Sequence, residues 1–397
     1  MVKNIIIKDF FSLNVFHIIT LIINFSILIF LSNKMNLSSF IIYVTSMTVV
    51  HYLVSIGFLF NIYLLKKFNE LDKNKFISNV QSLIILAFPF FLFLTLLIKK
   101  IFGNYLLIDN FYIIFLILCV SFLIYIIEIL RSYILKYKKI FHLGLFLVSL
   151  PIIRLILIFI LWNNFLTVWS VLLAYLISDL IIIFFFNIIF LKKILFFKFY
   201  SFTKETLNFF LNRINLILFF FIYPIILYLD IFVIYFLFPD TNEFNAYITT
   251  SFLVKNFIVL FNPLFQIMFK NISENKLKIT YFVQILIFLL FSFTLAIFLN
   301  LSAEYIFCNG LISINHCNTE LYNKLVFTIP FLVLFKAKLF YQLNKKIYFL
   351  EIIIHLFFIL LFVLGIIFYD IVSLNKVIII YLCIIILSTL LMSKRIN

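Results

Sequence analysis

The residues of this sequence best suited to binding a charged ligand lie along one apolar segment. Tyr247, Ser251, Lys255, Asn262 and Gln266 are separated by 4, 4, 7 and 4 residues, a spacing that keeps them on one face of a helix. Lys255 is about eleven residues into the segment, ~16 Å at the helical rise, and therefore near the middle of any bilayer that the segment crosses. A cation at that depth either lines a wet cavity and receives an anionic ligand, or forms a structural ion pair.

Asp230, in the preceding apolar segment, is the candidate partner of Lys255 because both lie at a similar depth. It is also a candidate for a carboxylate that binds a proton or a cation. The two interpretations are compatible if Asp230 gates or tunes the lysine. Asn215 lies on the same helical face of that segment and is a candidate for ligand binding.

Further polar residues interrupt the apolar segments of the first half of the chain. Arg154, three residues after Pro151, is placed to reach a central cavity, and Asp179 lies near the middle of the next segment. Arg154 is a candidate partner of Asp179, although their expected depths differ. His51 and Asn24 lie on weaker polar stripes, where each is either a ligand-binding or a hydrogen-bonded packing residue. Glu128 and Glu351 are expected to be solvated near the cytoplasmic ends of their segments.

The four cysteines do not indicate a fold held together by several disulfides. Cys119 and Cys383 lie within apolar segments and are expected to be inert. Cys308 and Cys317 lie in a polar connection, where they either form a disulfide in an oxidising compartment or remain free thiols. His316 adds too few ligands for a metal site, and none is expected.

The sequence contains no Walker loop, HExxH motif or Cys/His metal spacing, and no Ser/His/Asp set can be argued. We therefore expect neither an enzyme nor a bound cofactor.

Composition indicates the elements that position these residues. Of the 397 residues, 66% are hydrophobic and 12% charged, which is more apolar surface than a soluble core of this size can bury. A bilayer accommodates it, at ~20 apolar residues for each crossing. We predict an all-α polytopic membrane protein of about twelve transmembrane helices. The apolar runs lie near 10–31, 38–65, 80–98, 110–130, 141–161, 165–190, 206–238, 244–269, 279–300, 322–341, 348–369 and 376–393.

The positive charges indicate the orientation of these helices. With the N-terminus inside, 23 of the 31 Lys and Arg residues fall on the cytoplasmic side, five fall outside and three lie within spans. This asymmetry predicts that both termini are cytoplasmic. It also explains the net charge of +16 without nucleic acid as a partner, since the charge faces anionic lipid.

The basic connection 191–205 divides the chain into six spans and six spans. We predict one six-helix bundle over residues 1–195 and another over 196–397, facing each other across a central cavity. The two halves show no convincing residue-level repeat along their length.

Two stretches resemble a known family. Residues 31–68 contain a short turn, an aromatic start to the second span and a later Gly and Asn, at Tyr43, Gly57 and Asn61. Residues 229–274 contain Asp230, a short turn, Ala246 with Tyr247, and Asn262 with Pro263. In these patterns, and in its span count, the chain resembles the bacterial Wzx flippases. These are exporters of O-antigen and capsule repeat units in the multidrug/oligosaccharidyl-lipid/polysaccharide (MOP) superfamily.

The resemblance implies a protein of the bacterial cytoplasmic (inner) membrane that works in lipopolysaccharide or other polysaccharide biosynthesis. It implies a cationic cavity that binds the diphosphate and acidic sugars of an undecaprenyl-linked repeat unit, with a polysaccharide polymerase and a chain-length regulator as partners. Two alternatives remain open. One is a lipid-linked glycan polymerase, which usually needs a larger outside loop. The other is a cation-coupled multidrug exporter, which would use deep carboxylates such as Asp179 and Asp230.

Overall fold

A computed structural model shows an all-α architecture, with no strand among the residues that it describes. The described residues are 2–67, 84, 87–89, 91–97, 99–100, 110–137, 140–162, 167–186, 188, 228, 230, 231, 233, 234, 242–258, 261, 279–302, 319–342, 353, 356, 357, 359, 360, 377–381, 383 and 386. The chain forms two compact units, Met1–Ile214 and Asn215–Asn397. Each unit is described by itself below.

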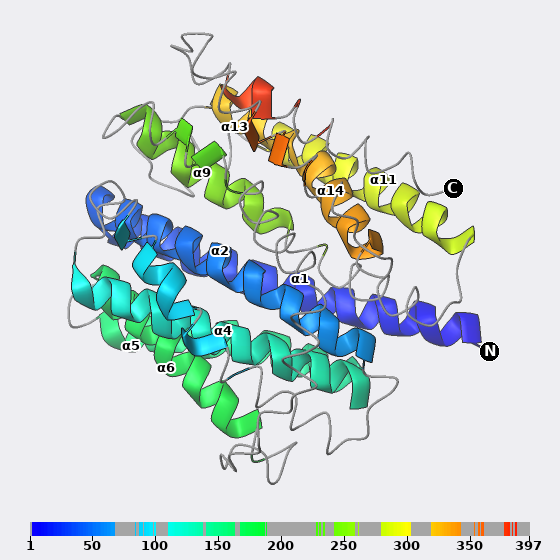
Figure 1. Ribbon diagram of the computed structural model, residues 1–397, viewed down its shortest axis with the longest axis horizontal. Helices are drawn as coiled ribbons and strands as arrows, with labels where there is room; N and C mark the ends of the chain where they lie inside the picture. The colour runs from blue at the N-terminus through cyan, green and yellow to red at the C-terminus, as the bar shows by residue number, and fades with distance from the viewer. Residues whose placement is uncertain are drawn as a thin grey trace. The chain divides into compact units, whose positions relative to one another are not determined.

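Unit 1 contains long helices that pack side by side (Figure 1). The helices are α1 (Val2–Lys34), α2 (Leu37–Lys67), α4 (Phe111–Tyr137), α5 (Ile140–Trp162) and α6 (Val168–Phe186). Helix α4 packs against α2, α5 and α6, and α5 packs against α1 and α6. Because α6 also contacts α2, polar side chains of α2, α5 and α6 can meet inside this unit.

Polar side chains cap the first turns of three of these helices. The Asn36 side-chain oxygen accepts a hydrogen bond from the Ser39 backbone N–H at 2.9 Å, at the start of α2. The Asn110 side-chain oxygen accepts one from the Tyr112 N–H at 2.9 Å, at the start of α4. At the start of α6, Thr167 and Ser170 each donate a backbone N–H to the other's hydroxyl. These oxygens satisfy backbone donors that have no partner within the helix.

Helix α5 contains a proline and a close contact with α1. Pro151 lies inside the helix without ending it, and Arg154 follows within the next turn. Gly144 approaches the Phe16 ring of α1 so closely that a Cβ atom at residue 144 would overlap the ring. Glycine therefore permits the contact between α1 and α5.

Unit 2 contains α9 (Asn242–Ile258), α11 (Ile279–Leu301), α13 (Thr319–Val326) and α14 (Ile329–Gln342) (Figure 1). Helix α9 packs against α13 and α14, and both of these pack against α11. The sequence predicts one continuous helix over 322–341, whereas the structure has a turn at Phe327 and Thr328 between α13 and α14. Pro330 explains the break, since its ring clashes with the carbonyl four residues earlier and it has no N–H to donate.

The described helices agree with the predicted membrane class. By length and composition, four helices among the described residues can cross a bilayer: Val15–Lys34, Phe111–Arg131, Phe141–Leu161 and Val168–Phe186. Many large apolar side chains on α1, α5, α6 and α11 are exposed, as expected for surfaces that contact lipid. The boundary predicted between residues 195 and 196 lies outside the described residues. The bounds 1–195 and 196–397 of the two bundles therefore stay a prediction.

The contact at Gly144 gives a stability prediction. Gly144→Ala should lower the melting temperature of the protein in detergent, corresponding to about 1–3 kcal/mol, because the new Cβ forces the Phe16 ring away. Leu145→Ala is the matched control, because Leu145 is exposed on the same helix. Equal melting temperatures for the two variants would show that α1 and α5 do not depend on this contact.

Candidate functional site

A buried ion pair joins Lys255 to Asp230 in unit 2. The Lys255 ammonium nitrogen, Nζ, lies 2.6 Å from Oδ1 and 2.9 Å from Oδ2 of Asp230. The Asp230 side chain has no exposed surface, whereas 12% of the Lys255 side chain is exposed. Lys255 lies in the last turn of α9, where the carbonyl end of a helix favours a cation.

Hydroxyl groups and aromatic rings complete this cluster. The Tyr247 hydroxyl donates to Asp230 Oδ2 at 2.7 Å, and the Ser251 hydroxyl donates to the same oxygen at 3.1 Å. The Lys255 ammonium also lies 5.0 Å from the ring centre of Tyr228 and 5.8 Å from that of Tyr381. Both carboxylate oxygens of Asp230 are thus satisfied, and the cation is flanked by two rings. We call Asp230, Tyr247, Ser251, Lys255 and these two tyrosines the unit 2 cluster.

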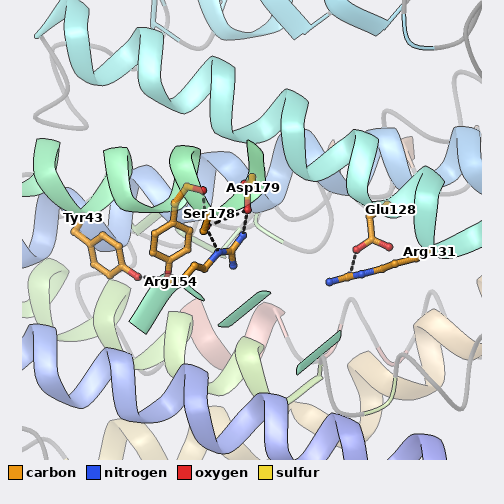
Figure 2. A network of polar contacts seen from close by, with 7 residues as sticks. Tyr43, Glu128, Arg131, Arg154, Ser178 and Asp179 are labelled. Carbon is orange, nitrogen blue, oxygen red and sulfur yellow. Dashed lines mark hydrogen bonds and ion pairs between the residues drawn. The ribbon is translucent and has the colours of Figure 1, made fainter. Parts of the chain in front are cut away.

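A second buried ion pair joins α5 to α6 in unit 1 (Figure 2). Arg154 Nη2 donates to Asp179 Oδ1 at 2.7 Å, and Arg154 Nε lies 3.4 Å from the Ser178 hydroxyl. The Arg154 guanidinium stacks on the Tyr175 ring, 4.3 Å from its centre, and the Tyr175 and Tyr43 hydroxyls are 3.1 Å apart. Tyr43 belongs to α2, so this unit 1 cluster of Tyr43, Arg154, Tyr175, Ser178 and Asp179 connects three helices.

The unit 1 pair is less completely bonded than the unit 2 pair. Asp179 is fully buried, yet its Oδ2 has no hydrogen-bond partner among the described residues. The Arg154 side chain is 11% exposed. A buried carboxylate oxygen without a donor carries a desolvation cost, so a proton, a water molecule or a cation bound there would stabilise the cluster.

A third ion pair lies along α4, between Glu128 and Arg131 (Figure 2). Glu128 was expected to be solvated, but its side chain is only 13% exposed. The expectation was wrong because Arg131, one turn later, provides a partner that lets the carboxylate lie inside the unit.

In each of the three ion pairs the two charges cancel, so the described interior carries little net charge. This limits how strongly these sites attract a charged ligand. Asp230 cancels most of the attraction of Lys255 for an anion, as Asp179 does for Arg154. An anionic group that reached Lys255 would find a third N–H on the ammonium, beyond those directed at Asp230, and 12% of this side chain is exposed. Such a ligand would compete with Asp230, while Tyr247 and Ser251 continue to hold the carboxylate.

Most of the predicted site residues that the structure describes belong to these clusters. Ser251 and Lys255, predicted to share one helical face, both contact Asp230, and the pairs proposed for Lys255 with Asp230 and for Arg154 with Asp179 are both formed. His51 is half-buried on α2 and interacts electrostatically with Arg154, whereas Asn24 is exposed on α1. The predictions that fall outside the described residues are those for Asn215, Asn262, Cys308 and Cys317.

Sequence reasoning missed the role of the tyrosines. It noted Tyr43 only as part of a family pattern and did not consider Tyr175, Tyr228 or Tyr381. With 21 tyrosines in the chain, composition does not single these out. A usable signal was the position of Tyr175 one helical turn before Asp179. Within the described residues, no group of three His, Cys, Asp or Glu side chains is arranged to hold a metal ion.

The fold is similar to that of solved transporter structures. A MOP superfamily transporter from Pyrococcus furiosus matches over 98% of this chain and 95% of its own, with a TM-score of 0.70 and 15% identity. A multidrug resistance MATE family transporter of the MOP superfamily matches over 97% and 93%, with a TM-score of 0.68 and 16% identity. The eukaryotic MATE transporter AtDTX14 matches over 98% and 94%, with a TM-score of 0.68 and 14% identity. This chain has the fold of a MOP superfamily transporter.

That fold confirms the predicted class, an all-α multi-pass membrane protein with about twelve helices in two bundles. No model of a known family matches the sequence. No curated protein matches it either. The similarity is therefore one of structure, at sequence identities that carry the fold alone.

The unit 2 cluster gives a prediction about charge pairing. Lys255→Met leaves Asp230 as a buried carboxylate without its cation, and should destabilise the protein by about 3–5 kcal/mol. Asp230→Asn in addition removes the unpaired charge and should recover most of that loss. Melting temperatures of the wild type, both single variants and the double variant measure the coupling. Additive effects in this cycle would mean that the two side chains do not act as a pair.

Proposed function

We propose that this chain is a flippase that moves undecaprenyl-diphosphate-linked oligosaccharide repeat units across the bacterial cytoplasmic membrane by alternating access. The observation that carries the proposal is the arrangement at Lys255. The Lys255 side chain is 12% exposed, and its counter-ion Asp230 also accepts hydrogen bonds from two hydroxyl groups. A diphosphate can therefore exchange for the carboxylate at Lys255 without leaving Asp230 devoid of hydrogen bonds.

The chemistry of the unit 2 cluster suits a ligand that combines phosphate and sugar. Phosphate oxygens accept hydrogen bonds from an ammonium, and sugar hydroxyls pair with the hydroxyl groups of tyrosine and serine. Aromatic rings such as Tyr228 and Tyr381, both near the cation, are apolar surfaces on which a sugar ring packs. In this proposal, Arg154, His51, Asn24, Asn215 and Asn262 contribute further contacts to the substrate, and Asp179 and Asp230 provide coupling or gating.

A second candidate function is cation-coupled export of drug-like molecules, and the unit 1 cluster favours it. Asp179 Oδ2, which has no hydrogen-bond partner among the described residues, is a place where a proton or a metal cation would be stabilised. The fold is shared with a multidrug resistance transporter and also with a transporter whose binding pocket has reversed polarity, which suggests a different function for that protein. The fold alone is therefore compatible with either substrate, and the charge of the binding site is what distinguishes the two candidate functions.

Deleting the gene distinguishes the candidate functions. If the chain is the flippase, complete lipid-linked repeat units should accumulate on the cytoplasmic face of the membrane, where added glycosidases do not reach them in intact spheroplasts. Unpolymerised units already on the outer face would contradict the flippase and favour a polymerase. Unchanged lipid-linked glycans with increased sensitivity to drugs would favour the multidrug exporter.

A charge-neutral variant tests the role of Lys255 without disturbing the fold. Asp230→Asn with Lys255→Gln keeps hydrogen-bonding groups at both positions and removes both charges, so the protein should reach the membrane at normal levels. Transport of a labelled undecaprenyl-diphosphate oligosaccharide in proteoliposomes should fall by at least about tenfold, because one charge-assisted contact is lost. Full transport by this variant would remove Lys255 from the substrate site.

A matched control separates loss of binding from general damage. Thr249→Ser, on the buried face of α9 and outside both ion pairs, should transport the labelled lipid at the wild-type rate. A similar loss in this variant would mean that the assay reports on packing of α9 and not on the charge of Lys255.

A further inference from the structure

Helices α2 and α9 carry the same sequence pattern, although the two halves show no repeat at first sight. The segment Tyr43–His51 reads YVTSMTVVH, and Tyr247–Lys255 reads YITTSFLVK. The tyrosine, a threonine and a valine are identical, and most of the other positions are similar in kind. Phenylalanine precedes the tyrosine by three residues in both helices.

The structure supports this alignment through burial. Tyr43 and Tyr247 are both buried, as are the aligned threonines Thr45 and Thr249. The last aligned residues, His51 and Lys255, are both half-buried. The two helices thus present the same positions to the interior of their own units, which makes residue 51 the counterpart of residue 255.

The tyrosines of the two clusters correspond as well. In unit 1, Tyr43 contacts Tyr175 of α6, and the cation of Arg154 stacks on the Tyr175 ring. In unit 2, Tyr247 donates a hydrogen bond to the acid that pairs with Lys255, and the Lys255 ammonium lies 5.8 Å from the centre of the Tyr381 ring. Tyr381 follows Tyr247 at nearly the same separation along the chain as Tyr175 follows Tyr43.

The charges of the two clusters, however, come from different helices. Unit 2 takes its cation from α9, whereas unit 1 takes it from α5, a helix that does not correspond to α9. The unit 2 acid, Asp230, aligns with Ser26 of α1, which bonds to the Ile22 carbonyl of its own helix. Unit 1 instead takes its acid, Asp179, from α6.

We propose that each unit is organised around one equivalent charge position, a cation above the later tyrosine of the pair, and that residue 51 can supply it in unit 1. What the cluster requires is a positive charge at that place next to the buried acid, whichever helix provides it. Residue 51 aligns with Lys255 and is half-buried like it, so a lysine there should lie over the Tyr175 ring as Lys255 lies over the Tyr381 ring. The proposal concerns the architecture of the units and does not depend on the transported substrate.

A rescue experiment tests the equivalence. Arg154→Met removes the cation and should reduce the amount of folded protein in the membrane roughly tenfold, because Asp179 is left unpaired. Adding His51→Lys should return that amount to within roughly twofold of the wild type. Fluorescence-detected size-exclusion chromatography of a tagged protein measures the folded amount. The matched control is Arg154→Met with Val54→Lys, which places the lysine one turn along α2 and should not rescue.

Two further variants settle a negative result. His51→Lys alone shows whether α2 tolerates the lysine, and Arg154→Met with Asp179→Asn shows whether the site tolerates loss of its charges. If both of these fold and Arg154→Met with His51→Lys does not, residue 51 cannot supply the cation and the proposal is wrong. Equal rescue by Val54→Lys would also overturn it, because any nearby lysine would then suffice.

Discussion

A charge inside an apolar bundle is stable only beside an opposite charge, and this constraint organises both units of the protein. Asp179 and Asp230 have no exposed surface, and each lies against a cation from another part of its unit. Arg154 thereby ties α5 to α6, and Lys255 ties α9 to the segment that precedes it. Apolar side chains can slide past one another at small cost, but a buried ion pair cannot, so these pairs fix the register of the helices that carry them.

The two clusters differ in how completely the buried carboxylate is hydrogen-bonded. In unit 2, two hydroxyl groups and an ammonium satisfy both oxygens of the carboxylate, and the lysine side chain is 12% exposed. In unit 1, the arginine makes a single contact with its acid and stacks on a tyrosine, and one carboxylate oxygen has no donor among the described residues. In the first arrangement, every oxygen of the acid is already bonded. In the second, one oxygen of the acid has no hydrogen-bond partner among the described residues.

The sequence predicted the membrane class and the ion pairs, because charge at bilayer depth is rare and its partners are few. Lys255 and Asp230 could be matched by depth, and the spacing along the helix placed Ser251 on the same face as Lys255. The depth argument was less useful for Arg154 and Asp179, because arginine is long enough to bridge positions that differ in depth. The tyrosines could not be predicted, since only packing shows which ring lies under a cation. The break between α13 and α14 also depends on one local conflict, at Pro330, that hydropathy does not register.

Pro151 gives α5 a mechanical property that its neighbours do not share. A proline has no N–H, so the carbonyl of Leu147 lacks the backbone bond that the rest of the helix makes. Bending at this point breaks one hydrogen bond fewer than bending elsewhere. Such a bend would move Arg154, which lies less than one turn away. The weakest place in the helix therefore lies beside its only described ion pair, so a small change of angle there would be felt first as a change in the distance between a guanidinium and a carboxylate.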